Sequence, residues 1–111
     1  MINLFVYGLM KKGKPNHSAL EGAEFSINKV LHKHVIYGTR FVYPVMIYTG
    51  NPRDYVIGEI YKITLDKKEE LDHIERGFNF TKVDTDLHSY IMAVAHLLHY
   101  EPLHNIARNN F

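Results

Sequence analysis

The stretch NLFVYGLMKKGKP, residues 3–15, begins with apolar residues and ends in a basic loop that contains a second glycine. The run from Leu4 to Tyr7 is bounded by Gly8, which is typical of a short central strand buried on both faces. A strand that ends on a glycine can simply enter a turn. It can also form a backbone cradle for an anion, because glycine permits close approach and consecutive N–H groups create an anion-binding concavity.

The composition limits the classes of protein that this sequence can encode. The chain has 111 residues, 46% hydrophobic and 23% charged, so we expect one globular domain over residues 1–111. It has no cysteine, which excludes disulfides and thiolate metal sites, and we expect a cytoplasmic protein. It shows no signal peptide and no apolar run long enough to span a bilayer. The net charge of +1 gives no electrostatic case for binding nucleic acid or a membrane, and we expect the lysines of residues 11–14 to be solvated.

Several further segments are rich in β-branched and aromatic residues. Residues 25–31 alternate loosely between apolar and polar residues. Besides the first strand, the predicted strands cover residues 35–37, 41–42, 45–49, 55–63, 80–84 and 90–97. The last of these could equally be a helix on propensity alone. Gly58 interrupts the 55–63 strand, which indicates a bulge or a close backbone approach.

Two helices are expected between these strands. A short one covers residues 17–24, with Asn16 as its N-cap. The clearer one covers residues 66–76, with Asp66 beginning a capping box and Gly77 at the C-terminal cap. Strands with two intervening helices predict an α+β domain with a curled or closed sheet.

Glu75 stands out within the second helix. It lies four residues after Leu71 and next to Ile74, so its carboxyl group points toward the apolar side or its edge. Partial burial and the C-terminal end of the helix both raise the pKa of a carboxylic acid, which suits a general acid or base. The alternative is a solvated glutamate that pairs with Arg76 or Lys68.

Four pieces of the chain, in order, resemble the γ-glutamylcyclotransferase-like family, which includes γ-glutamylamine cyclotransferase-like and AIG2-like proteins. They are LFVYG, Tyr43-Pro44, VIGEIYKI and LDHIE, and the resemblance runs from Leu4 to about residue 95. It implies a small mixed β-barrel with flanking helices. It also implies an enzyme, free of metal or organic cofactors, that converts γ-glutamyl amines or peptides into 5-oxoproline and a free amine.

The resemblance also implies roles for particular residues. Glu75 closes the family's Leu-Asp-x-x-Glu motif and would be the general acid/base that serves both proton transfers. The turn after the first strand would present backbone N–H groups to an anionic group of the substrate. The substrate-binding residues implied in this way are Tyr7, Gly8, Leu9, Met10, Tyr43 and Phe80.

The chain also departs from the family pattern at several positions. Leu9 replaces a small hydroxyl residue, Arg76 replaces a glycine, Phe80 replaces a tyrosine and Lys82 replaces an arginine. These departures favour a rival hypothesis, a non-catalytic module that binds a small anionic metabolite, whereas the retained Glu75 favours the enzyme. A second rival, a nucleic-acid-binding protein that uses exposed tyrosines, is disfavoured by the near-neutral charge. The leaving amine, the oligomeric state and the role of residues 101–111 stay open.

Other polar residues carry weaker signals. His32 and His34 would share one face of a strand, and His96 and His99 could do so on a helix, but neither pair has a clear third ligand. We therefore expect structural histidines and no metal site. Glu59, next to Gly58 in a strand, is expected to have a structural or supporting role.

Overall fold

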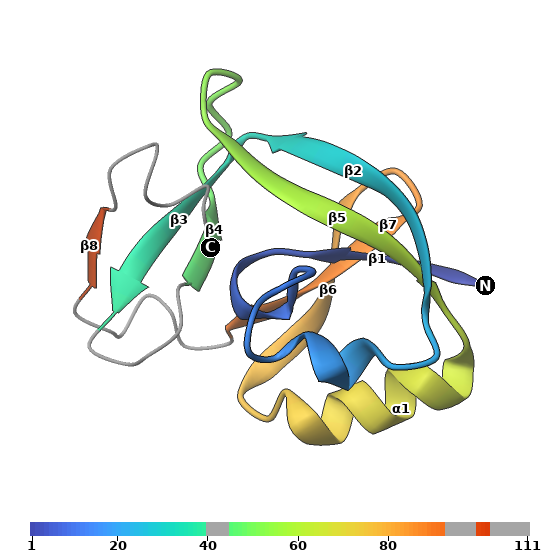
Figure 1. Ribbon diagram of the computed structural model, residues 1–111. Helices are drawn as coiled ribbons and strands as arrows, with labels where there is room; N and C mark the ends of the chain where they lie inside the picture. Colours follow the sequence, from blue (N-terminus) through green and yellow to red (C-terminus); the bar gives the residue numbers. More distant parts are fainter. Residues whose placement is uncertain (40–44, 93–99, 103–111) are drawn as a thin grey trace.

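The computed structural model describes residues 1–39, 45–92 and 100–102, and strands in two sheets make up most of this part (Figure 1). The strands are β1 (Ile2–Val6), β2 (Glu24–His32), β3 (His34–Thr39), β4 (Val45–Tyr48), β5 (Tyr55–Ile63), β6 (Phe78–Asp84), β7 (Leu87–Met92) and β8 (Tyr100–Pro102). The helical segments are the helix α1 (Leu65–Ile74) and the short 3-10 turns η1 (Gly8–Met10) and η2 (His17–Leu20). The predicted α+β class is therefore confirmed.

The main sheet has the strand order β2-β5-β1-β7-β6, and a smaller sheet has the order β4-β3-β8. The predicted closed barrel is wrong, because the edge strands β2 and β6 are not hydrogen-bonded to each other. The sheet nevertheless curls enough for Lys29 Nζ on β2 to lie 3.7 Å from Asp84 Oδ2 on β6. Each edge strand also has a register irregularity, between Phe25 and Ile27 in β2 and between Lys82 and Asp84 in β6. Bulges of this kind are typical of sheet edges and increase the local bend.

Strand β1 lies in the middle of the main sheet and is buried on both faces, as its apolar run predicts. Leu4 and Val6 belong to one apolar cluster, together with Leu71 of α1. Phe5, pointing the other way, belongs to a second cluster that includes Met46 of β4. Two-sided burial explains why this segment is apolar without alternation.

Gly58 marks a close backbone approach, one of the two predicted possibilities. A methyl group at this position would overlap the Phe5 ring and the carbonyl oxygen of Val6 on the neighbouring strand β1. Any side chain here would push against a strand that forms part of the candidate site. Glycine is therefore required for packing.

The helix α1 is confirmed at nearly the expected position, but its predicted cap is wrong. Thr64, not Asp66, is the N-cap, and its Oγ1 accepts a hydrogen bond from the backbone N–H of Lys67 at 3.1 Å. Asp66 lies in the first turn, where its charge favours the helix dipole. The helix ends at Ile74, and Gly77 follows with a φ of +88°, the left-handed conformation expected near a helix C-terminus.

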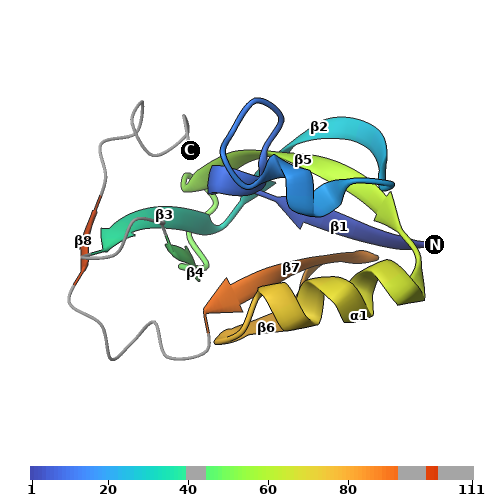
Figure 2. The same ribbon diagram turned by 60° about the horizontal axis from the view of Figure 1, so that its bottom comes forward.

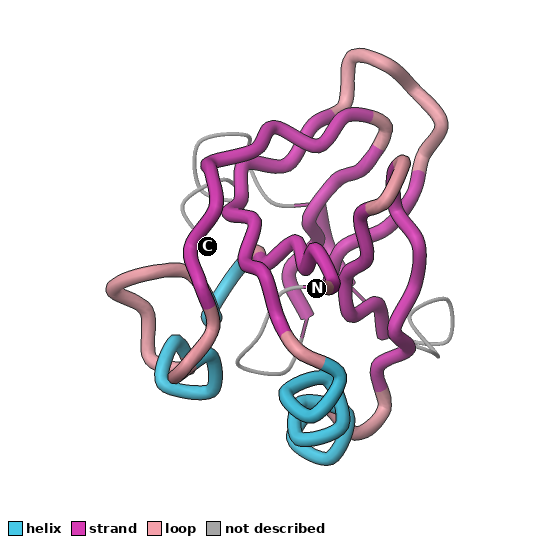
Figure 3. The backbone as a smooth tube through the Cα atoms, turned by 90° about the vertical axis from the view of Figure 1, so that its right-hand side faces the viewer, coloured by secondary structure: helices cyan, strands magenta, loops and turns pink. Residues whose placement is uncertain are grey.

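The other expected elements differ in smaller ways. The predicted helix at residues 17–24 is only the 3-10 turn η2, and the side chain of Asn16 makes no capping hydrogen bond. Residues 41–42 and 93–97 lie outside the described residues, so the last predicted strand is confirmed only as far as Met92. Helix α1 lies against the main sheet, where Tyr90 of β7 donates a hydrogen bond to Asp72 of the helix. Figure 2 shows α1 beside the ends of β6 and β7, and both α1 and η2 lie in the lower part of Figure 3, with most strands above them. Within the described residues, none of the helices could cross a membrane.

Candidate active site

The candidate site forms where β1 and β7 separate. The two strands run parallel but are paired at one position, Leu4 with His88. Beyond this position, Ser89 Oγ donates to the carbonyl of Phe5 at 2.7 Å, and the Tyr7 hydroxyl donates to the carbonyl of Tyr90 at 2.9 Å. The two hydroxyl groups thus donate to backbone carbonyls that N–H groups of the neighbouring strand would pair with in a continuous sheet. They therefore stabilise the separation of β1 and β7.

A cavity of about 240 Å³ opens at this separation. Its walls come from the end of β1, the turn η1, the C-terminal end of α1 and the strands β6 and β7. The volume is below the roughly 300–1,000 Å³ of pockets that hold drug-sized ligands, so the cavity suits a small metabolite. The structure brings together five predicted site residues around it, namely Tyr7, Gly8, Leu9, Met10 and Glu75.

Glu75 is held firmly by its backbone at the end of α1. Its N–H donates to the carbonyl of Leu71 at 2.7 Å, and its own carbonyl accepts from the N–H of Phe78 at 3.0 Å. The side chain is partly buried, and this burial raises the pKa of the Glu75 carboxyl above its ordinary value. Among the described residues it forms no ion pair with Arg76 or Lys68, so the solvated-pair interpretation does not describe this glutamate.

The turn η1 lies where the anion-binding cradle is predicted. Gly8 is buried and has a φ of +67°, a left-handed conformation that glycine adopts without steric cost. Tyr7 occupies the N-cap position, and its side chain makes no capping hydrogen bond. The first N–H groups of a helical turn have no acceptor inside the turn, so Gly8 and Leu9 can present theirs to a ligand. This geometry is compatible with an anion-binding turn, whose function remains a prediction.

Three hydrogen bonds fix the turn η1 and the loop that follows it. The N–H of Asn16 donates to the carbonyl of Leu9 at 2.8 Å, and His17 Nδ1 donates to the carbonyl of Met10 at 2.9 Å. Glu59 Oε1 accepts from the N–H of Lys12 at 2.9 Å. The supporting role expected for Glu59 thus has a definite form, because its carboxylate holds the loop beside the cradle.

Two tyrosines lie near Glu75 but are poor candidates for proton transfer. Burial raises the pKa of the Tyr7 phenol, and its hydroxyl is already engaged with the carbonyl of Tyr90. Burial and a 2.8 Å hydrogen bond to Asp72 raise the pKa of Tyr90. Both phenols stay protonated at neutral pH, so among the described residues that line the cavity the Glu75 carboxyl group is a better candidate for proton transfer than either tyrosine.

Two predicted substrate-binding residues have a different status. Phe80 does not line the cavity, because it stacks on His88 with ring centroids 4.7 Å apart and lies under Lys68 Nζ. Phe78, two residues earlier on β6 and therefore on the same face of the strand, contributes to the cavity instead. Tyr43 lies outside the described residues.

Sequence reasoning missed Ser89 and assigned no role to Tyr90, although both line the cavity. Nothing in the local pattern marks Ser89, because its importance comes from the carbonyl of Phe5, which lies 84 residues away. Tyr90 falls inside a predicted strand, but no spacing rule relates a strand residue to a distant helix.

The histidine pair does not form a metal-binding face. His32 and His34 belong to different strands, separated by Lys33 with a φ of +67°. The buried His34 donates from Nδ1 to the carbonyl of His32 at 2.8 Å, and its ring meets that of Tyr48 edge to face. No group of three metal-ligating side chains occurs within the described ranges, and His96 and His99 lie outside them.

The fold and the cavity define an α+β protein in which a partly buried glutamate and a glycine-containing turn line the same small pocket. The chain belongs to the γ-glutamyl cyclotransferase, AIG2-like family, whose sequence model matches residues 4–108. Members of this family act on small γ-glutamyl compounds.

Several solved structures share this fold. An AIG2-like protein from Mus musculus is 22% identical, with a TM-score of 0.72 over 95% of this chain and 98% of that chain. An uncharacterised protein from Pyrococcus horikoshii is 18% identical, with a TM-score of 0.73 over 93% and 86% of the two chains. An allophanate hydrolase from Kluyveromyces lactis is 16% identical, with a TM-score of 0.70, and this chain covers 17% of it and 84% of itself. At these identities the likeness concerns the fold. No curated protein sequence matches the chain.

Proposed function

We propose that this protein is a γ-glutamylcyclotransferase-type enzyme that acts on a γ-glutamyl amine or peptide and releases 5-oxoproline and a free amine. One observation carries the proposal: the partly buried carboxyl group of Glu75, with its raised pKa, lines the same small cavity as the turn Tyr7–Met10. Family membership supports the same class of substrate. The absence of cysteine is compatible with a cytoplasmic location for this activity.

In the proposed reaction, the ionised Glu75 takes a proton from the α-ammonium group of the substrate. The freed nitrogen attacks the γ-carbonyl carbon of the same molecule and closes a five-membered ring. The bond between that carbon and the leaving nitrogen then breaks as the Glu75 carboxyl group gives its proton to the departing amine. The ring nitrogen, which still carries one proton more than it has in 5-oxoproline, loses that proton to the Glu75 carboxylate, which passes it to the released amine. One residue can serve both steps because its acid and base forms alternate through the cycle. These steps need proton transfers alone, so we propose no metal or organic cofactor.

Because the attack is intramolecular, the protein mainly has to hold the substrate folded back on itself. We assign the α-carboxylate of the substrate to the N–H groups of the turn at Gly8 and Leu9, where the backbone is fixed by the contacts of Asn16, His17 and Lys12. Backbone donors do not depend on the side chain, so Leu9 can replace a hydroxyl residue without loss of this contact. We keep Tyr43 as a further proposed contact to the substrate.

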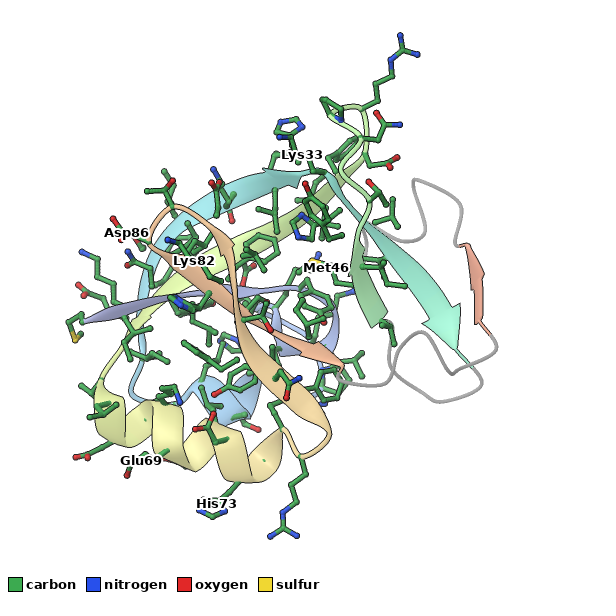
Figure 4. The ribbon with its side chains drawn as sticks, turned by 180° about the vertical axis from the view of Figure 1, so that it is seen from behind. Lys33, Met46, Glu69, His73, Lys82 and Asp86 are labelled. Atoms are coloured by element: carbon green, nitrogen blue, oxygen red, sulfur yellow. The ribbon has the colours of Figure 1, made fainter. Side chains whose placement is uncertain are left out.

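The test is a mass-spectrometric search for 5-oxoproline with a panel of γ-glutamyl amines and γ-glutamyl peptides. Glu75→Gln should lower the rate by about 10²–10⁴-fold, which is the usual contribution of general acid–base catalysis. Glu69→Gln is the matched control, because Glu69 lies on the same helix but extends away from the sheets (Figure 4), and it should retain the native rate. Native rates in Glu75→Gln would rule out the assigned role.

A binding module without catalysis is the second candidate. Arg76, an exposed cation beside Glu75 that lines the cavity, and Leu9 in the turn are the observations that favour it. Calorimetric titration with the same panel separates the two functions. Binding without release of 5-oxoproline would support the module, whereas turnover would support the enzyme.

A further inference from the structure

We propose that Asp72 and Tyr90 are positioning residues, which fix the C-terminal end of α1 on the main sheet and thereby hold the Glu75 carboxyl group at the cavity. Asp72 belongs to the helix and Tyr90 to strand β7, and a hydrogen bond joins them. The effect on turnover rests on the proposed function. The effect on the placement of Glu75 does not.

The contact is part of a small polar network. The Tyr90 hydroxyl donates to Asp72 Oδ1 at 2.8 Å and lies 3.3 Å from the carbonyl oxygen of Lys68. Asp72 Oδ2 accepts from Lys68 Nζ at 2.8 Å, and the same ammonium lies 4.7 Å from the centre of the Phe80 ring. Both oxygens of Asp72 are thus engaged, one by the helix itself and one by the sheet.

The helix has few other means of fixing its rotation. Of the ten residues of α1, Leu71 is the one that is fully buried, and Leu65 and Ile74 are both more than half exposed. Figure 4 shows Glu69 and His73 on the outer side of the helix. A single apolar anchor fixes the distance between the helix and the sheet but leaves the helix able to turn about its axis. Asp72, adjacent to Leu71, supplies the second anchor.

Glu75 follows Asp72 by three residues, close to one helical turn, so the two side chains are neighbours at the end of the helix. Its backbone is tied to Leu71 and Phe78, and a rotation of the last turn would move its carboxyl group relative to the cavity. Tyr90 itself lines the cavity and is 5% exposed, so its ring cannot move away easily. The pair therefore joins the fixed wall of the cavity to the element that carries Glu75.

The chemistry of the pair suits a permanent anchor. Hydrogen bonds from Lys68 and then from Tyr90 lower the pKa of the Asp72 carboxyl, so it remains an ionised acceptor at neutral pH. A hydrogen bond to an ionised group is shorter and stronger than one between neutral groups. Asp72 does not line the cavity, and of its hydrogen-bond partners Lys68 and Tyr90, Tyr90 is the one that does, which distinguishes a positioning residue from a second catalytic acid.

The test compares Tyr90→Phe, Asp72→Ala and their double mutant. Each single change should lower kcat by about 10- to 100-fold, the range expected from a displacement of about 1 Å, and should change KM by less than about threefold. The double mutant should be no slower than the slower single mutant, because both remove one contact. Asp72→Asn keeps an acceptor oxygen for the phenol and should restore most of kcat. Glu70→Gln, which removes the exposed carboxylate of the Lys67–Glu70 pair on the same helix, is the control and should keep the native kcat.

A second readout does not require turnover. Carbon-13 NMR of the glutamate carboxyl groups, with the signal of Glu75 assigned by its loss in Glu75→Gln, follows the titration of this residue directly. In Tyr90→Phe and Asp72→Ala, its midpoint should move toward that of an exposed glutamate, while in Glu70→Gln it should not move. An unchanged titration of Glu75 in both variants would overturn the proposal.

If the native protein makes no 5-oxoproline, the proposed function fails, but the titration still decides the role of Asp72 and Tyr90. Asp72 is half exposed, so Asp72→Ala serves the test even if Tyr90→Phe does not fold.

Discussion

Replacement of Gly58 by alanine tests the close approach of β5 to β1. The added methyl group would overlap the Phe5 ring and the Val6 carbonyl oxygen. Phe5 is 1% exposed in a packed cluster, and Val6 lies on the central strand, so neither can give way without disturbing the core. Both residues also line the cavity, so the substitution strains the site as well as the sheet.

Two opposing effects set the size of the change. Alanine has less conformational freedom than glycine in the unfolded chain, which stabilises the fold by about 0.4–1 kcal/mol. Overpacking a core with an extra carbon costs typically about 1–3 kcal/mol. Since one of the overlapped atoms belongs to the backbone, we expect the upper part of this range at Gly58 and a net loss of about 1–2.5 kcal/mol. For a chain of this length, this corresponds to a decrease in Tm of roughly 4–10 °C.

The assay is urea denaturation followed by circular dichroism, with Gly58→Ala measured in the native background and in Phe5→Leu. The smaller leucine removes the ring overlap but leaves the Val6 carbonyl in place, so the cost of Gly58→Ala should fall without vanishing. Gly13→Ala is the control. A methyl group there meets no atom within 4 Å, and its cost, due to a φ of +82°, should be the same in both backgrounds. Native stability of Gly58→Ala, or a cost that does not depend on Phe5, would refute the reasoning.

Three further predictions concern stability and pH. Thr64→Ala should lower the free energy of unfolding by about 1 kcal/mol because it removes the cap of α1, while Asp66→Ala should cost less; urea denaturation of both variants checks this order. Ser89→Ala should cost about 1–3 kcal/mol in the same assay, because it leaves the buried carbonyl of Phe5 without a partner, and an unchanged midpoint would contradict this. The raised pKa of Glu75 means that the folded state binds the proton of this carboxyl group more tightly than the unfolded state does. The contribution of Glu75 to the free energy of unfolding is therefore fully present at low pH and is lost as the pH rises through the folded pKa. Glu75→Gln should therefore have a higher Tm than the native protein at pH 7, and the difference should shrink as the pH falls toward 4; a lower Tm at pH 7 would contradict the effect of burial.

Much of the fold can be predicted from local patterns. The uninterrupted apolar run ending at Gly8 and the cap-and-stripe pattern of α1 reflect constraints that act within a few residues, and the structure confirms both elements. The prediction of Asp66 as the cap failed because Thr64, two positions earlier, is also a good capping residue and is the one that caps α1. Barrel closure failed for a different reason: it depends on whether the two edge strands pair, and within the described residues β2 and β6 are linked by the ion pair between Lys29 and Asp84 without being hydrogen-bonded neighbours in the sheet.

In the candidate site, too, local patterns locate some residues, whereas others depend on contacts between distant parts of the chain. Glu75 and the turn after β1 could be identified because a family motif and a strand-terminating glycine mark them in the sequence. Phe80, which the family resemblance implied, does not line the cavity, whereas Phe78 does, because alternation defines a face of β6 but not which residue on that face reaches the cavity. Ser89 and Tyr90 act on residues far away in the sequence, so their roles depend on tertiary pairing that no local pattern encodes.

The most direct test of the proposed reaction is to run it in water labelled with oxygen-18 and to analyse the products by mass spectrometry. Intramolecular cyclisation predicts 5-oxoproline without the heavy isotope, in equal amount to the free amine, and neither product from Glu75→Gln above background. The appearance of glutamate carrying oxygen-18 would show that water, and not the substrate's own amino group, attacks the γ-carbonyl. That result would contradict the cyclotransferase mechanism, even if Glu75 proved essential.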